Sequence, residues 1–461
     1  MLNRILQYFS EISSVPRCSK NEKGIVHYIM NWASNKGFLY LADKYGNCLV
    51  YGSVNTGERV ILQTHVDMVC EKIKESSHDF LKDPIKLILD GDILRAHETS
   101  LGADNGIGMA ISMVLMEEFS KELDLRLLFT VDEETGLNGA KGLEAGFVDA
   151  DFLLNLDSEE DDTIIVGSAG GCDIIITKEL RKIFAGFDSR YYRIELDGFN
   201  GGHSGVDIHK SFGNAIKVLL KVLKLSGIKK VVNLGGGTAH NAIPRYAYAD
   251  VEYNMDVSLL EDIIVKVLGE FKNDSPYFKI TELDRPEYIF DFEDLIEILE
   301  RFPHGVFKEF SGEFSGVESS SNLAKIGIDN DQVVIVESLR GASKSALDEL
   351  KLHIENYLKG FKYYYCCEYP GWQTNKNSRL LELAKNVYFE MFQENPKVEV
   401  IHAGLECGIL YDKNNSLDII SVGPNIRNPH SPDEKVYLSS IEKSYRFVYN
   451  IIRSIIQIPC R

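Results

Sequence analysis

The feature that most constrains the fold is an alternation of strand-like apolar runs with helical segments in the first third of the chain. Strand-like runs span residues 59–63, 125–131 and 152–156, and apolar residues at helical spacing span 2–12, 22–35 and 107–119. Because a helix carries the chain back between two parallel strands, this order predicts an α/β fold with a mostly parallel sheet flanked by helices. In such sheets, ligands bind beyond the carboxyl ends of the strands.

Side chains that bind metals or move protons follow all three strand-like runs. His65 and Asp67 follow the first run, Glu133 and Glu134 follow the second, and Asp157 follows the third. Because parallel strands end at the same edge of a sheet, we expect these side chains to lie close together. Each signal is weak by itself, since a loop histidine or a pair of glutamates is more often solvated surface.

Asp104 lies in Gly-Ala-Asp-Asn-Gly, residues 102–106, where the helical run 107–119 begins. Taken alone, this stretch is most simply a helix cap. A carboxylate held on a turn with its second oxygen free can also bridge two metal ions. His430 lies between two prolines near the C-terminus and, taken alone, is most simply a surface loop histidine.

Together these residues predict a site for two metal ions. Zinc binds histidine nitrogen and carboxylate oxygen, and two ions about 3.5–4 Å apart need a shared ligand. A workable set places His65, Asp104 and Asp157 on one ion and Asp104, Glu134 and His430 on the other.

Two acidic residues beside this set suit supporting roles. Asp67 follows His65 by two residues on an extended segment, so it can orient the imidazole. Glu133 precedes the ligand Glu134 and points elsewhere, so it is free to act as a base.

The composition argues against several partners. The 461 residues include 50 basic and 69 acidic side chains, a formal charge of −19, which is unsuited to nucleic acid or to an anionic membrane. Residues 1–9 lack a signal-peptide pattern, and no run approaches the ~20 apolar residues that span a bilayer. The eight cysteines include no CxxC pair. We therefore expect a cytoplasmic protein with reduced thiols and no membrane partner.

A second domain is predicted where the pattern changes near residue 181. Strands are expected at 192–196, 246–257 and 332–339, helices at 214–225 and 345–358, and a glycine-rich turn at 201–205. We interpret 185–373 as an inserted α+β domain. The first domain is then discontinuous, formed by 1–184 and 374–461.

Eight motifs in chain order resemble one known family. They are His-Val-Asp-Met-Val at 65–69, Leu-Gly-Ala-Asp-Asn-Gly at 101–106, Asp-Glu-Glu at 132–134, Asn-Leu-Asp-Ser-Glu-Glu at 155–160, Gly-Gly-His-Ser-Gly at 201–205, Asn-Ala-Ile-Pro-Arg at 241–245, His-Ala-Gly-Leu-Glu-Cys at 402–407 and Gly-Pro-Asn-Ile-Arg-Asn-Pro-His-Ser-Pro at 423–432. The chain resembles the aminoacyl-histidine dipeptidases of the di-zinc aminoacylase/carboxypeptidase G2-like superfamily over nearly its whole length.

The resemblance implies a zinc-peptidase catalytic domain with an inserted lid, two divalent ions (zinc, with cobalt or manganese as substitutes), and small peptides as substrates. Glu133 would be the general base, and His203 in the lid would stabilise the oxyanion. Asn241, Arg340 and the Gly404 loop would hold the substrate's terminal carboxylate, since arginine offers a fork for it. A loop role for His203 and a surface role for Arg340 are the simpler alternatives. A homodimer is left open.

Other functions compete with dipeptide hydrolysis. An N-acyl-amino-acid deacylase or a tripeptidase would use the same scaffold. A metal-binding homologue without catalysis is disfavoured by the presence of Glu133. A two-metal phosphatase would need basic, phosphate-gripping residues near the ligands, and none is identified for that role.

Overall fold

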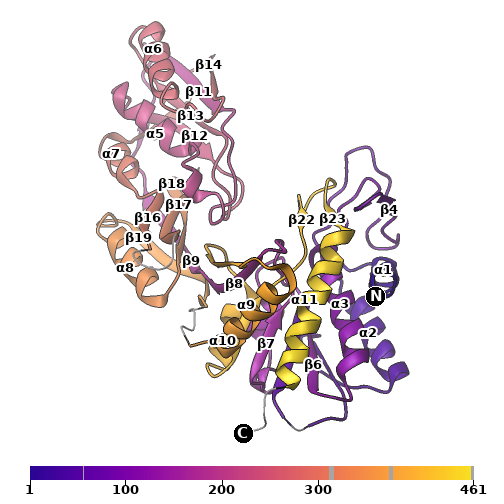
Figure 1. Ribbon diagram of the computed structural model, residues 1–461. Helices are drawn as coiled ribbons and strands as arrows, with labels where there is room; N and C mark the ends of the chain where they lie inside the picture. Colours follow the sequence, from indigo (N-terminus) through magenta and orange to yellow (C-terminus); the bar gives the residue numbers. More distant parts are fainter. Residues whose placement is uncertain (56, 311–315, 373–376, 458–461) are drawn as a thin grey trace. The chain divides into compact units, whose positions relative to one another are not determined.

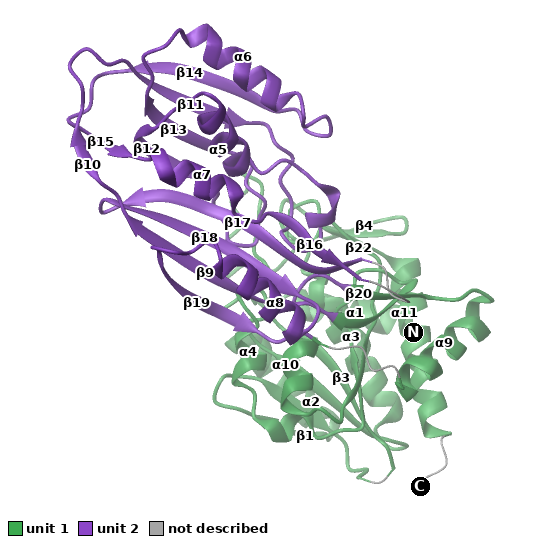
Figure 2. Cartoon of the chain, turned by 90° about the vertical axis from the view of Figure 1, so that its left-hand side faces the viewer, with its two compact units in different colours: residues 1–167, 372–400, 405–461 green, residues 168–371, 401–404 purple. Residues whose placement is uncertain are grey.

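The computed structural model describes residues 1–55, 57–310, 316–372 and 377–457 (Figure 1). The chain divides into two compact units (Figure 2). Unit 1 comprises Met1–Gly167, Trp372–Val400 and Leu405–Arg461, and unit 2 comprises Ser168–Gly371 and Ile401–Gly404.

Unit 1 is built on an eight-stranded sheet whose central strands are parallel. The order is β1 (Leu39–Ala42), β2 (Cys48–Tyr51), β6 (Asp124–Thr130), β3 (Arg59–His65), β7 (Phe152–Asn155), β21 (Asp418–Ser421), β8 (Thr163–Ser168) and β20 (Lys397–Ile401). β3 pairs in parallel with β6 and β7, and β7 pairs in parallel with β21. The β1–β2, β2–β6 and β21–β8 pairs are antiparallel. The predicted parallel character therefore holds at the centre of the sheet, where the strands are buried.

The helices of unit 1 pack on this sheet and on one another. They are α1 (Leu2–Ser13), α2 (Lys23–Lys36), α3 (Ala103–Phe119), α4 (Asn138–Gly142), α9 (Arg379–Phe392), α10 (Glu406–Lys413) and α11 (Leu438–Ile456), with a 3₁₀ turn at Ala145–Val148. α3 is apolar on all sides and contacts β3, β6, α1 and α11, which is why it is almost wholly buried. α2 ends at Gly37, whose φ of 77° is a left-handed conformation that glycine adopts readily.

A smaller four-stranded sheet in unit 1 has the order β22 (Ile426–Arg427), β23 (Lys435–Tyr437), β5 (Ile93–Ala96) and β4 (Leu87–Asp90). β23 pairs with β5, so the C-terminal segment that carries His430 is joined to the N-terminal third of the chain. This return of the C-terminal segment is what the proposed ligand set requires.

Unit 2 is built on an eleven-stranded sheet. Its main path is β14 (Tyr277–Leu283), β11 (Tyr191–Asp197), β13 (Ala247–Glu252), β12 (Lys230–Gly236), β17 (Val317–Asp329), β18 (Gln332–Gly341), β9 (Gly170–Glu179) and β19 (Lys362–Tyr369). The side strands are β10 (Lys182–Phe184), β15 (Tyr288–Asp291) and β16 (Gly305–Glu309). The helices are α5 (Ala215–Leu225), α6 (Val257–Leu268), α7 (Glu293–Arg301) and α8 (Lys344–Glu355), with a 3₁₀ turn at Ile208–Lys210. Sheet and helices share one apolar core.

One predicted strand of unit 2, at 246–257, is too long. β13 ends at Glu252, and α6 begins at Val257 because the Asp256 side chain accepts a hydrogen bond from the backbone N–H of Ser258 and caps the helix. The alternation of apolar and polar residues continues beyond β13 through Tyr253, Met255 and Val257, which is why the strand was predicted to extend that far.

The units differ from the domain limits read from composition. The limit between residues 184 and 185 falls inside unit 2, directly after β10. β9 pairs with β18 and β19, so the chain enters the second sheet before its composition changes near residue 181. The other limit, between 373 and 374, lies outside the described residues.

Candidate metal centre and catalytic site

Five side chains of unit 1 converge beyond the ends of β3, β6 and β7. His65 Nε2 lies 2.9 Å from Asp104 Oδ1 and 3.2 Å from Asp157 Oδ1. His430 Nε2 lies 3.1 Å from Asp104 Oδ2 and 3.1 Å from Glu134 Oε1. The two oxygens of Asp104 thus face different imidazoles, and each imidazole has one further carboxylate beside it.

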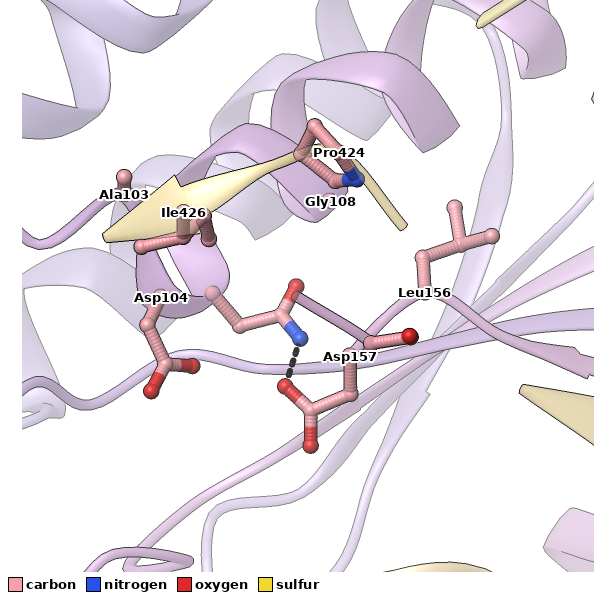
Figure 3. A pocket seen from close by; sticks show the side chains of 9 residues that line it. Ala103, Asp104, Gly108, Leu156, Asp157, Pro424 and Ile426 are labelled. Carbon is pink, nitrogen blue, oxygen red and sulfur yellow. Dashed lines mark hydrogen bonds between the residues drawn. The ribbon is translucent and has the colours of Figure 1, made fainter. Parts of the chain in front are cut away.

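The backbone around Asp104 directs its carboxylate into the site rather than to the helix end. The N-cap of α3 is Gly102, with φ 69°, and no side chain caps the helix. The alternative interpretation of Asp104 as a helix cap is therefore wrong, because both of its carboxylate oxygens face histidines. The carboxylate of Glu434 instead accepts hydrogen bonds from the backbone N–H groups of residues 101–104, at 2.7–3.4 Å. Asp104 and Asp157 line the pocket in Figure 3.

Arg17 ties together the two segments that carry His65 and Asp104. Its guanidinium is buried and donates to the carbonyl oxygens of Val66 at 3.0 Å, Asp67 at 2.8 Å and Gly102. A side chain at Gly102 would collide with Arg17, since an added Cβ would lie 2.5 Å from the guanidinium. The role of Arg17 was not predicted, because an arginine in a polar loop carries no sequence signal for it.

Asp67 orients several groups of the site at once. Its side chain is fully buried, and Oδ1 lies 3.5 Å from Nδ1 of His65. The carboxylate also accepts hydrogen bonds from the backbone N–H groups of Glu133 at 3.0 Å and Glu134 at 3.2 Å, and from the Ser19 hydroxyl at 2.8 Å. Burial would raise the pKa of Asp67, but the hydrogen bonds, led by that with His65, lower it overall. Asp67 is thereby kept as an ionised acceptor.

The carboxylates of this site lie close enough together to shift the pKa values of one another. Burial raises the pKa of Glu133 well above its ordinary value, and Glu134 raises it further against the opposing effect of His65. Burial also raises the pKa of Glu134, with Asp104 adding to it. His430 shows the complementary effect: burial would lower its pKa, but Asp104 and Glu134 raise it to about 11. The carboxylates around Asp104 therefore stabilise a positive charge placed among them.

The donor set fits divalent metal ions. Two imidazoles and three carboxylates are ligands that zinc accepts. Donor atoms of His65, Asp104 and Glu134 all lie within 4.8 Å of one another. Bound cations would relieve the repulsion among the buried carboxylates.

The expectation that all cysteines are reduced thiols is wrong for one pair. Cys18 and Cys70 form a disulfide between the segment of Arg17 and Ser19 and the segment that follows Asp67. The two residues are 52 positions apart and share no motif, so only the folded chain brings them together. Among the described residues the free cysteines are Cys48, Cys172, Cys366, Cys367 and Cys407, and Cys460 lies outside those residues.

Unit 2 contains a second polar cluster around Arg340 of β18. The Arg340 guanidinium is buried, donates to the Tyr369 hydroxyl at 2.8 Å and to the Ser204 hydroxyl at 3.3 Å, and lies 3.5 Å from Nε2 of His203. Gly404 packs closely against the Tyr369 ring: a Cβ added at residue 404 would lie 2.8 Å from a carbon of that ring. The surface alternative for Arg340 is therefore wrong, and the structure brings His203, Arg340 and Gly404 into one cluster.

Asn241 and His402, two further residues near Arg340, differ in the burial of their side chains. Asn241 has an exposed side chain, and only its backbone carbonyl joins the cluster, accepting from the N–H of Ser204 at 2.8 Å. Nε2 of His402 lies 2.7 Å from the Ser320 hydroxyl, and burial lowers the His402 pKa to about 3, which keeps the imidazole neutral. Tyr369 and Ser320 were missed by the sequence analysis because neither stands in a recognisable motif.

The sequence profile of Peptidase family M20/M25/M40 matches residues 61–454, and the chain belongs to this family. Its members are metallopeptidases, and the chain has the mixed α/β fold of this family.

Two relatives resemble the chain over nearly its full length. The cytosol non-specific dipeptidase of Escherichia coli (strain K12) is 35% identical over 97% of this chain and 96% of its own. The crystal structure of aminoacylhistidine dipeptidase from Vibrio alginolyticus superposes with a TM-score of 0.82 at 31% identity, over 98% of this chain and 96% of that one. The aminopeptidase PepT from Bacillus cereus shares only the fold, with a TM-score of 0.58 at 15% identity over 99% of both chains.

No helix in the described part of the chain combines the length and the apolar character that crossing a membrane requires.

Proposed function

We propose that this chain is a cytoplasmic di-zinc dipeptidase. The observation that carries the proposal is the placement of Asp104, whose two carboxylate oxygens lie 2.9 Å and 3.1 Å from two different histidines. The two full-length relatives are named as dipeptidases, one of them as a cytosolic protein. Zinc is proposed because the donor set joins imidazole with carboxylate, and cobalt or manganese would suit the same donors.

The residues of unit 1 divide between holding the ions and moving the proton. His65, Asp104 and Asp157 would hold one ion, and Asp104, Glu134 and His430 the other. When bound, the ions supply a Lewis acid for the peptide carbonyl and lower the pKa of water. Glu133 would take the proton of the attacking water and give it to the departing amine, a task that suits a carboxyl of raised pKa.

Unit 2 would act as the lid, in which His203 would stabilise the oxyanion and Arg340 would bind the substrate's terminal carboxylate. Nδ1 of His203 accepts hydrogen bonds from the N–H groups of Gly205 at 3.2 Å and Val206 at 3.1 Å. Nε2 therefore carries the proton and can donate to a developing oxyanion. The buried Arg340 guanidinium is suited to the substrate's terminal carboxylate, with Asn241 and Gly404 as its proposed helpers.

Hydrolysis of a substrate panel by zinc-, cobalt- and manganese-loaded protein tests this proposal. The panel contains dipeptides including β-alanyl-histidine, tripeptides and N-acyl amino acids. We expect two ions per chain by elemental analysis and the highest kcat/KM with dipeptides. Preference for tripeptides or acylated amino acids would replace the proposed substrate class. No hydrolysis at full metal loading would favour a binding protein.

A further inference from the structure

A fully buried carboxyl of unit 1 has no part in the proposed ligand set. Glu406 is the first residue of α10 and has no exposed surface. Its Oε2 accepts hydrogen bonds from the Gln63 amide at 2.6 Å and from the Thr130 hydroxyl at 2.7 Å. Its Oε1 is buried without a hydrogen-bond partner among the described residues. Burying a carboxyl in this way is costly, so a compensating role is expected.

Glu406 closes a row of hydrogen bonds that crosses four neighbouring strands. Oε1 of Gln63 accepts from the Asn155 amide at 2.6 Å, and Oδ1 of Asn155 accepts from the Ser421 hydroxyl at 2.5 Å. Each strand contributes one fully buried member: β6 contributes Thr130, β3 Gln63, β7 Asn155 and β21 Ser421. All donors of the row point toward Glu406.

The direction of the row depends on its last acceptor. An amide has a donor end and an acceptor end, whereas Oε2 of Glu406 accepts from both of its neighbours. Glu406 therefore turns the NH₂ group of Gln63 toward itself and the carbonyl of Gln63 toward Asn155. Asn155 is oriented in the same sense toward Ser421. Without the carboxylate, the Gln63 NH₂ group would keep only the Thr130 hydroxyl, 3.2 Å away, as its acceptor. A hydroxyl both donates and accepts, so it does not determine which end of the amide faces it.

The row lies directly below the proposed ligands. Gln63 and Asn155 pair in register on β3 and β7, and each precedes a proposed ligand, His65 or Asp157, by two residues. Residues two apart on a strand point to the same face, as Gln63 and His65 do on β3, while Asp157 lies two residues beyond the end of β7. Thr130 pairs with His65 and ends the strand that leads to Glu133.

We propose that Glu406 is a positioning residue of the metal centre: it orients the row and thereby holds the ends of β3, β6 and β7 at the spacing that the ligands need. This inference rests on the proposed function for its catalytic consequence, and on the geometry of unit 1 for its effect on metal binding. Burial raises the pKa of Glu406 to about 7, with Asp157 and Asp67 contributing and His65 and Thr130 opposing.

Two variants of Glu406 separate acceptance of hydrogen bonds from packing. Glu406→Gln keeps an acceptor oxygen in a side chain of the same shape, whereas Glu406→Leu removes the acceptor at similar volume. Asp412→Asn removes a carboxylate from the exposed side of the same helix and is the matched control. Zinc affinity by chelator competition, kcat, KM and the thermal midpoint are measured for each.

Glu406→Leu is expected to lose about 10–100-fold in zinc affinity, and a similar factor in kcat, since partners behind metal ligands typically matter this much. KM should change little, because no part of the row is a proposed substrate contact. Glu406→Gln should restore zinc affinity and kcat to within about threefold of wild type, a difference of only ~0.65 kcal/mol. Asp412→Asn should match wild type.

Two results would overturn the proposal. One is Glu406→Leu with wild-type zinc affinity and kcat but a lower thermal midpoint, which would leave only packing. The other is Glu406→Gln as impaired as Glu406→Leu, which would mean that the acceptor does not matter. If wild type binds zinc but hydrolyses no dipeptide, the proposed function fails, and the zinc affinities still test the row.

Thr130→Val is the reserve if Glu406→Leu does not fold. It removes one donor to Glu406 with little change of shape, and zinc affinity should fall by about 2–12-fold, the equivalent of one hydrogen bond. Unchanged zinc affinity in a folded Thr130→Val protein would also overturn the proposal.

Discussion

The candidate metal centre of unit 1 and the Arg340 cluster of unit 2 carry opposite charges and lie on different structural elements. In unit 1, histidines and carboxylates follow the ends of buried parallel strands, and a buried arginine and a disulfide join the segments that carry them. In unit 2, one buried arginine on β18 is joined by residues of the glycine-rich turn at 201–205 and by Tyr369.

The difference indicates a division of tasks between the two regions. The first region favours cations, as the raised pKa of His430 shows. The second offers donors to an anion: the Arg340 guanidinium only donates, and Nδ1 of His203 accepts from two backbone N–H groups, which leaves the proton on Nε2. Variants in unit 1 should therefore alter metal binding or proton transfer, and variants in unit 2 should alter substrate binding or oxyanion stabilisation while leaving the metal in place.

The largest expected effect comes from Glu133→Gln. Loss of a general base typically costs ~10²–10⁴ in rate, and the variant should keep both ions because Glu133 is not a proposed ligand. Steady-state kinetics and elemental analysis of zinc-loaded protein measure the two effects. Glu134→Gln is the contrasting variant and should lose zinc. A kcat near wild type for Glu133→Gln would remove the residue from the mechanism.

The disulfide should stabilise unit 1 and leave unit 2 unaffected. Closing a loop of 52 residues is worth about 4 kcal/mol in the chain-entropy description. The double variant Cys18→Ser/Cys70→Ser should therefore exchange amide hydrogens faster in unit 1 only. Cys367→Ser, at an exposed free cysteine, is the matched control. Equal exchange rates in wild type and double variant would show that the bond adds no stability.

His203→Ala should lower kcat by about 10²–10³-fold while KM and zinc content stay near wild type, because an oxyanion donor acts mainly in the transition state. His209→Ala, at an exposed histidine in the next turn, is the control. Kinetics of the zinc-loaded variants decide the matter. If His203→Ala retains kcat within about threefold, the oxyanion role is excluded, since that factor is only ~0.65 kcal/mol of barrier.

Arg340→Met should raise KM and change kcat less. Hydrogen bonds to a charged group are worth about 1.5–3 kcal/mol, or roughly 12–160-fold in binding. Comparing dipeptides with their C-terminal amides isolates the carboxylate contact: wild type should prefer the free acid, and the variant should lose that preference. Arg301→Met, at an exposed arginine of unit 2, is the control. A preserved preference for the acid would move the carboxylate site elsewhere.

Sequence reasoning predicted the central fold of unit 1 and the residues that converge there. The apolar runs and the turn residues that bound them identify β3, β6 and β7, because buried parallel strands are continuous apolar runs. The motif residues follow the ends of these strands. The strand at 246–257 was predicted too long because the apolar alternation continues past Glu252, the last residue of β13, up to the start of α6. The domain limit at 185 differs from unit 2 because composition changes only after β9 has joined the sheet.

The sequence by itself therefore determined the α/β class, the chemistry of the predicted site and the family of the chain, since these depend on local periodicity and on residue types in order. Only the tertiary structure decided which groups support them. The Glu434 carboxylate on residues 101–104, the Cys18–Cys70 bond and the row closed by Glu406 all join positions that are far apart in the chain. Their pairing carries no local signal, because only the folded chain brings each side chain next to its distant partner.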